Sequence, residues 1–289
     1  RPKTHLDYLE RTKWNVVVDG DTSEMYQGEN PIITFPELAM AARGLGYLSI
    51  KFDRDGVFRR APLLIKFHGG FYPSFPFRAI CEFLKVPPGN IILRPGKSVT
   101  LKNASPPGGM MHDIVIPVDD RCNLVINYIG PWDRMKHYDF ADVLTVSDSR
   151  EDMEIMAEEF QGRIAVVSEV STGSSDIAPV PTDNNFPLSG LHANVLHTIL
   201  SENFLIEFTD FQMVFIEVLL MVIVLIFAFK LSSRGLRYGT VIVLAGYLAS
   251  CALLFLYMNV IVNIIRPSLM IVGSVFSIIA YRYINEEKE

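Results

Sequence analysis

Long apolar runs are confined to the last quarter of the chain, where short connections separate them. Each run has about the length that a helix needs to cross a hydrocarbon core about 30 Å thick. The pattern predicts three transmembrane helices, at Met213–Phe229, Tyr238–Tyr257 and Pro267–Ile284. We therefore divide the chain into a water-soluble domain (residues 1–210), a membrane region (211–284) and a short charged segment (285–289).

The first 210 residues change repeatedly between the apolar period of a strand and that of a helix. Strands are predicted at Trp14–Asp19, Gly46–Phe52, Val57–Phe67, Ile91–Leu93, Ser98–Leu101, Asp113–Pro117, Cys122–Tyr128 and Arg163–Ser168. Helices are predicted at Pro36–Arg43, Pro73–Val86, Phe140–Leu144, Glu151–Phe160 and Gly190–Asn203. This order predicts an α/β fold, in which helices pack on a mixed central sheet.

Three local signals add detail to the predicted sheet. The Asp-Gly pair in Asp53–Gly56 predicts a hairpin between the strands on either side of it. A turn at Asp119-Asp120 predicts a second hairpin, between the strands Asp113–Pro117 and Cys122–Tyr128. The run Arg163–Ser168 is apolar without alternation, which is typical of a buried parallel strand.

The connections between the apolar runs differ in charge, and this difference predicts the orientation in the membrane. The first connection carries Lys230, Arg234 and Arg237, whereas Met258–Asn263 carries no charge. Basic connections stay in the cytoplasm, so three crossings put the soluble domain outside and the C-terminal segment inside. Because a large exported domain needs a signal, we expect a further membrane helix upstream, and a cytoplasmic effector downstream.

Two charged residues lie within or beside the apolar runs at matching depths. Glu217 is about one turn into the first run, and Arg266 opens the third. Either each side chain extends to the outer headgroups, or the two form an ion pair that joins the first and third helices. The sequence leaves both alternatives open.

Composition and motifs exclude several classes of function. The net charge of −6 and the lack of basic runs argue against nucleic acid as a partner. No nucleophile elbow, P-loop, HExxH or Cys/His metal spacing occurs, so we predict no catalytic residue, metal or cofactor in this chain. Asp53 and Asp55 begin like a calcium loop, but Leu64 stands where the bidentate Glu is needed. Cys81 and Cys122 are either a disulfide or two buried thiols.

Adjacent arginines are the first candidates for ligand binding. Arg59 and Arg60 follow each other in a predicted strand, so we expect their side chains on opposite faces. One is expected to form a structural ion pair, with Asp53, Asp55 or Asp176 as the acid. The other is then available to an anionic ligand or a partner subunit.

Three further polar residues are candidates near the last soluble helix. His192 and Asn194 open that helix, where they either cap and pack it or contact a ligand. Asp176 follows a Ser-rich segment and either caps this loop or lies at the mouth of a pocket.

Several stretches together resemble one known family. They are Ala39–Gly46, Asp53–Pro62, Phe71–Phe75, Leu124–Pro131, Phe140–Leu144, Phe160–Val167 and Gly190–Leu196. In this order, ahead of three apolar runs, they resemble CHASE2 domains, the extracytoplasmic sensors that precede class III nucleotide cyclases, histidine kinases and Ser/Thr kinases. The resemblance covers about residues 7–284. The loop Ser168–Asp176 departs from the family pattern, because it lacks the glycine that usually follows the strand.

The resemblance implies a receptor segment in the plasma membrane or a bacterial inner membrane, with lipid and an unknown extracytoplasmic ligand as partners. It implies a cytoplasmic class III adenylate cyclase, which makes cyclic AMP from ATP in an active site between two chains, and hence a homodimer. Small residues at Gly239, Ala245, Gly246 and Ala249 permit close helix approach, within one chain or between two. The alternatives are a histidine or Ser/Thr kinase receptor and a non-enzymatic structural subunit.

Overall fold

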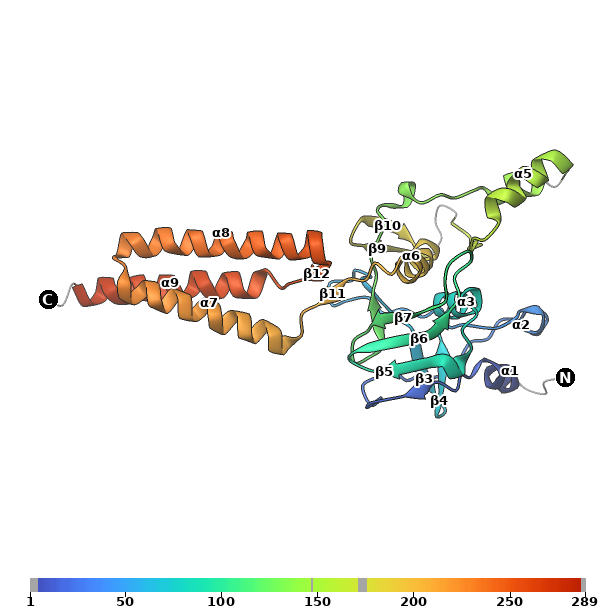
Figure 1. The fold of residues 1–289 in the computed structure, drawn as a ribbon, viewed down its shortest axis with the longest axis horizontal. Coiled ribbons are helices and arrows are strands. Elements are labelled where there is room, and N and C mark those ends of the chain that lie inside the picture. The colour runs from blue at the N-terminus through green and yellow to red at the C-terminus, as the bar shows by residue number, and fades with distance from the viewer. Residues whose placement is uncertain (1–4, 147, 171–175, 287–289) are drawn as a thin grey trace. The chain divides into compact units, whose positions relative to one another are not determined.

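A computed structural model describes residues 5–146, 148–170 and 176–286 (Figure 1). The chain divides after Phe204 into two compact units. We call the first the α/β unit and the second the helical unit, and we describe each by itself.

The strands of the α/β unit form one larger sheet and several pairs. Within the described residues, the larger sheet has the order β1-β5-β6-β7, with β1 parallel to β5 and the other neighbours antiparallel. Its strands are β1 (Val17–Val18), β5 (Ile91–Arg94), β6 (Ser98–Ala104) and β7 (His112–Pro117). The antiparallel pairs are β2 (Arg60–Pro62) with β8 (Asn123–Val125), β3 (Leu64–Phe67) with β4 (Gly70–Pro73), and β9 (Ile177–Val180) with β10 (Asp183–Pro187).

The five helices predicted for this unit are confirmed, with ends that move by no more than three residues. They are α2 (Pro36–Ala41), α3 (Phe75–Phe83), α4 (Phe140–Val146), α5 (Arg150–Phe160) and α6 (Leu188–Leu200). The structure adds α1 (His5–Thr12) and two short 3-10 turns, η1 (Pro88–Asn90) and η2 (Trp132–Arg134). Mixed strands with packed helices confirm the predicted fold class.

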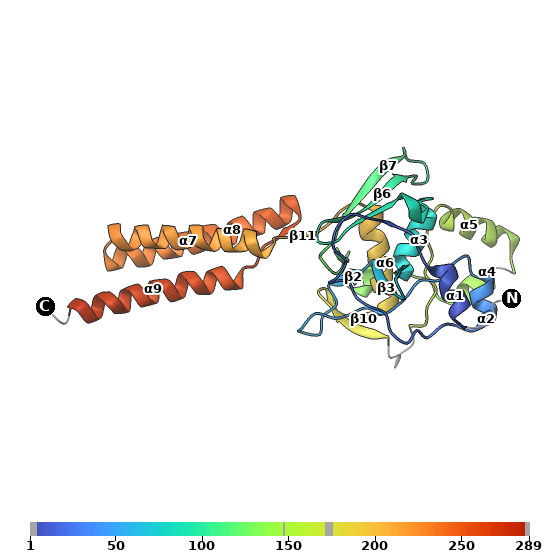
Figure 2. The ribbon, with the colours of Figure 1, turned by 90° about the horizontal axis from the view of Figure 1, so that it is seen from below.

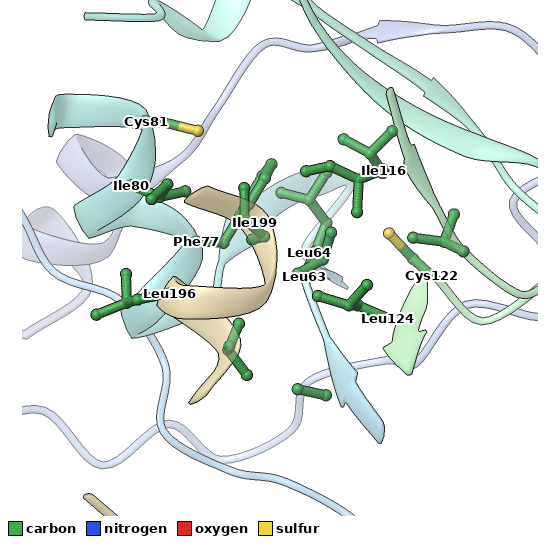
Figure 3. Close-up of a cluster of buried hydrophobic side chains, with 14 of the residues drawn as sticks. Leu63, Leu64, Phe77, Ile80, Cys81, Ile116, Cys122, Leu124, Leu196 and Ile199 are labelled. Carbon is green, nitrogen blue, oxygen red and sulfur yellow. The ribbon is translucent and has the colours of Figure 1, made fainter. Parts of the chain in front are cut away.

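The core of the α/β unit lies between two helices and the short strands. Helices α3 and α6 pack against each other, and both views show them side by side (Figures 1 and 2). Figure 3 shows Phe77 and Ile80 of α3 and Ile199 of α6 close to side chains from β3 and β8. Cys81 and Cys122 are both buried here as free thiols, which decides against the disulfide. Burial raises the pKa of Cys122 to about 12, so the thiol stays protonated.

The first predicted hairpin is wrong, although its turn forms. The Gly56 N–H donates to the carbonyl of Asp53 at 2.9 Å, but Gly46–Phe52 is not a strand. The apolar run after the turn is divided instead, because Pro62 has no N–H and Leu63 donates to the carbonyl of Cys122 at 2.9 Å. As a result β2 pairs with β8, while β3 pairs with β4.

The second predicted hairpin is wrong for a related reason. Asp119 closes a turn: its carbonyl accepts from the Cys122 N–H at 2.9 Å, and its N–H donates to the backbone carbonyl of Asn123 at 3.1 Å. Cys122 has a positive φ of 65° in this turn. The turn carries the chain from β7, which pairs with β6, to β8, which pairs with β2.

The predicted parallel strand Arg163–Ser168 does not form in the structure. Ile164 and Val166 are partly buried against the core, but Val167 is 78% exposed. Only alternate side chains therefore reach the core, although the sequence shows no alternation. The strand predicted at Trp14–Asp19 is also reduced, to Val17–Val18 with a bridge between Trp14 and Phe71.

The helical unit confirms the three predicted membrane helices. Within the described residues, three helices are long and apolar enough to span a membrane, namely α7 (Asp210–Lys230), α8 (Ser233–Met258) and α9 (Ile265–Glu286). Thr209 and Gln212 form a capping box at the start of α7. The short strands β11 (Ile206–Glu207) and β12 (Val260–Ile261) pair in parallel, which joins the start of α7 to the connection between α8 and α9.

Candidate functional site

A cavity of about 490 Å³ opens in the α/β unit between three connecting segments and the β2–β8 pair. This volume lies within the range of small-molecule sites, roughly 300–1,000 Å³. The lining is mostly polar and charged: Glu24, Tyr26, Lys51, Phe52, Asp53, Arg54, Arg60, Asp119, Asp120, Arg121 and Asn123. The cavity is therefore a candidate place for a small polar ligand.

The segment that carries Tyr26 is held along β3. The Lys66 N–H donates to the carbonyl of Tyr26 at 2.9 Å, and the Gly28 N–H donates to the carbonyl of Lys66 at 2.7 Å. The Lys66 ammonium donates to the hydroxyl of Thr22 at 3.1 Å. Met25 is 2% exposed and anchors the segment in the core. Tyr26, which follows Met25, lines the cavity.

The Asp119 turn supplies another part of the cavity lining. One carboxylate oxygen of Asp119 accepts from the Arg121 N–H at 2.9 Å and from the Asn123 N–H at 2.8 Å. The other accepts from the Asn123 side-chain amide at 2.8 Å. The Asp119 side chain thus stabilises its own turn and positions Arg121 and Asn123 beside the cavity.

Both arginines pair with the Asp53–Gly56 turn, whereas we expected only one to do so. Arg59 makes a two-fold contact with Asp55 at 2.9 and 2.8 Å, and Arg60 contacts both oxygens of Asp53 at 2.7 and 2.8 Å. Arg59 lies just before β2, so the alternation of a strand does not separate the two side chains. The Arg59 guanidinium lowers the pKa of Asp55 to about 2. Of the two arginines, only Arg60 lines the cavity.

Two cations of the lining approach the same aromatic ring. The Lys51 ammonium lies 4.6 Å from the centre of the Tyr26 ring, and the Arg121 guanidinium lies 5.8 Å from it. Both distances permit a cation–π interaction. Within the described residues, Lys51 and Arg121 form no ion pair with an acid. The same holds for three other lining residues, Arg54, Glu24 and Asp120. The cavity therefore offers charges of both signs and one aromatic ring.

His192 lies apart from the cavity, in the contact between α3 and α6. It is 8% exposed, and its ring is edge-on to Phe75 with 5.6 Å between the ring centres. Burial lowers the pKa of His192 to about 4, so the ring is neutral near pH 7. Its Nδ1 has no hydrogen-bond partner among the described residues. This environment favours packing over ligand contact.

Asn194 and Thr198 hold the chain segment after β8 against α6. The Asn194 side chain accepts from the Ile129 N–H at 3.0 Å and donates to the carbonyl of Gly190 at 2.8 Å. The Thr198 hydroxyl accepts from the Asn127 N–H at 3.1 Å. Two of the stretches that resemble CHASE2 domains are thus bound to each other, and Asn194 has a structural role.

Asp176 is exposed at the start of β9, and it is not one of the residues that line the cavity. Its carbonyl accepts from the Leu188 N–H at 2.9 Å, which ties it to the start of α6. The loop serines Ser171, Ser174 and Ser175 lie outside the described residues. Within the part of the chain that the structure describes, no group of three His, Cys, Asp or Glu side chains is placed to hold a metal.

Glu217 and Arg266 are joined in the helical unit. The Arg266 guanidinium donates to both carboxylate oxygens of Glu217, at 2.5 and 2.8 Å. The pair links α7 to α9. Arg282 makes a second link between the same helices, since it donates to the carbonyl of Leu231 at 3.1 Å and also to that of Ala228. Near α7, Gly239 of α8 leaves room for Phe227, because a Cβ there would approach the Phe227 ring to 2.7 Å.

The architecture defines a membrane protein with an α/β domain ahead of three candidate spans. A family model for the CHASE2 domain matches residues 6–227, which is more than half of the chain. The chain therefore belongs to the CHASE2 family. Comparisons with curated proteins and with solved structures found no match.

Of the residues that line the cavity, only Arg60 was a candidate ligand contact from the sequence. Tyr26, Lys51, Arg54 and Arg121 come from three separate loops, and only the fold brings them together. In the sequence, Tyr26 follows Met25 within the mostly polar stretch Asp21–Asn30, and this pattern gives no signal for a ligand site.

Proposed function

We propose that the chain is the extracytoplasmic sensor and membrane anchor of a transmembrane receptor. The observation that carries the proposal is the CHASE2 domain followed by three candidate spans. Lys230 ends α7, and Arg234 and Arg237 lie at the start of α8; these basic residues support a cytoplasmic position for the connection between the two helices. With three crossings, the α/β unit is then outside the cell membrane and its cavity is open to external ligands.

We further propose that the output is a cytoplasmic class III adenylate cyclase that makes cyclic AMP from ATP. The support is the resemblance to CHASE2 sensors of such cyclases. Because that active site forms between two chains, the receptor is expected to be a homodimer. Kinase outputs and a purely structural role remain the competing hypotheses.

Cysteine labelling tests the orientation. Ser233→Cys, next to the basic residues, should resist a membrane-impermeant maleimide in intact cells, whereas Asn184→Cys on exposed β10 should react. The native cysteines are buried and give a low background. Labelling of Ser233→Cys from outside would contradict the proposed orientation.

Expression of the complete gene in cells that lack adenylate cyclase tests the output. Cyclic AMP should accumulate, and the receptor should run as a dimer in nanodiscs by mass photometry. Autophosphorylation without cyclic AMP would instead identify a kinase receptor, and neither activity would favour the structural role.

A further inference from the structure

We infer that the cavity binds a small zwitterion of the amino-acid type, with one carboxylate and one ammonium group. This inference rests on the proposed receptor function and names the chemical class of its ligand. The geometry that points to it is one cavity of about 490 Å³ lined by an aromatic ring and by cations and carboxylates, several of which form no ion pair within the part of the chain that the structure describes.

The cationic side chains of the cavity favour an anionic group on the ligand. Lys51 and Arg121 both approach the Tyr26 ring, at 4.6 and 5.8 Å, and Arg54 lines the same space. Among the described residues, Lys51, Arg54 and Arg121 have no acidic partner. A carboxylate bound in the cavity can therefore accept charge-assisted hydrogen bonds from them, which are stronger than neutral ones.

The acidic residues of the cavity favour a zwitterionic ligand over a ligand that carries only negative charge. Asp53 is engaged by Arg60, and Asp119 by the N–H groups of its own turn. Glu24 and Asp120 form no ion pair among the described residues, and both line the cavity. A ligand with only negative charge meets these two carboxylates unfavourably, whereas an ammonium group pairs with them.

The sum of the lining charges leads to the same class of ligand. Four cations (Lys51, Arg54, Arg60 and Arg121) face four acids (Glu24, Asp53, Asp119 and Asp120), so the formal charge of the lining is zero. A net-neutral ligand with separated charges leaves this balance unchanged. The Tyr26 ring, beside Lys51 and Arg121, supplies an apolar face for the ligand's side chain or its Cα hydrogens.

Isothermal titration calorimetry on the whole chain in lipid nanodiscs tests the inference. The probes are the common α-amino acids and, for each one that binds, the matching carboxylate without the amine and the matching amine without the carboxylate. At least one amino acid should bind. Each truncated analogue should bind about tenfold more weakly or worse, which corresponds to about 1.4 kcal/mol.

Matched variants locate the binding. Arg121→Gln and Glu24→Gln should each weaken binding about tenfold or more, because each removes one charged partner. Arg150→Gln and Glu158→Gln, on exposed α5, remove the same charges away from the cavity and should leave affinity unchanged. Lys51→Gln repeats the cation test should Arg121→Gln fold poorly.

The outcomes separate this inference from the receptor proposal. Failure of every amino acid to bind, equal binding of the plain carboxylate, or unchanged affinity in both cavity variants would each overturn the zwitterion site. None of these results bears on the cyclic AMP measurement. Conversely, amino-acid binding that leaves the output of the complete protein unchanged would support the site and speak against a receptor controlled through it.

Discussion

The α/β unit and the helical unit use the same chemistry, a bidentate arginine–carboxylate pair, in two different solvents. In the α/β unit, Arg59 and Arg60 share the acids of one partly exposed turn. In the helical unit, Arg266 and Glu217 meet on helices apolar enough to lie in lipid. Water competes for the first group of charges, while lipid offers the second pair no alternative partner. Equal geometry therefore does not mean equal stabilisation.

The largest effect is expected from breaking the pair in the helical unit. Glu217→Gln or Arg266→Gln leaves one charge without its partner in a medium of low polarity, and should lower the thermal midpoint of that unit by about 10 °C. The double substitution should be milder than the sum of the two, because no charge is then stranded. A double-mutant cycle on thermal unfolding in detergent measures the coupling. Additive effects would show that the two charges act independently.

A smaller but clear effect is expected from a buried neutral contact in the α/β unit. Asn194→Ala leaves the Ile129 N–H without its acceptor and should destabilise this unit by about 2 kcal/mol, or about 6 °C. Asn184→Ala, at an exposed position of β10, is the matched control and should be nearly neutral. Differential scanning calorimetry compares the two. Equal midpoints for both variants would mean that water replaces the Asn194 contact.

The ion pairs of the Asp53–Gly56 turn should matter less than the pair in the helical unit, because water reaches them. Arg59→Gln should lower the midpoint of the α/β unit by no more than about 3 °C, and this loss should shrink further at high salt. The same salt titration on Arg266→Gln should leave its larger loss nearly unchanged. A salt-independent loss for Arg59→Gln would remove the distinction between the two units.

The smallest effect concerns pH. His112 Nδ1 lies 3.0 Å from the carbonyl of Met110, and Nε2 lies 2.6 Å from Glu202. Both partners are acceptors, so the doubly protonated ring fits best. The contacts with Met110 and Glu202 raise the pKa of His112 above its usual value of 6.5. The charge of nearby Asp113, which also pairs with Lys102, acts in the same direction.

The sign of the pH effect follows from this raised pKa. The stabilisation is fully present below about pH 6.5 and is lost as the pH rises through the folded-state pKa. Glu202→Gln should therefore lower the midpoint by about 1–2 °C at pH 5.5 and change it little at pH 8.5. Glu158→Gln serves as the control on exposed α5. A deficit that grows with rising pH would contradict the assignment.

The sequence by itself determined the features that depend on neighbouring residues along the chain. Helices carry their period, their caps and their apolar length locally, so the five helices of the α/β unit and the three membrane helices were predicted with small errors at their ends. The order of short matching stretches also sufficed for the family.

Only the tertiary structure decided which strands pair and which loops meet. Asp53 and Asp119 both form the turns that their sequence predicts, but the flanking strands do not pair across these turns: β2 pairs with the distant β8, and β7 pairs with the preceding strand β6. The cavity has the same origin, since Tyr26, Lys51 and Arg121 belong to three separate loops. Strand pairing and loop convergence depend on non-local contacts, and neither leaves a periodic signal in the sequence.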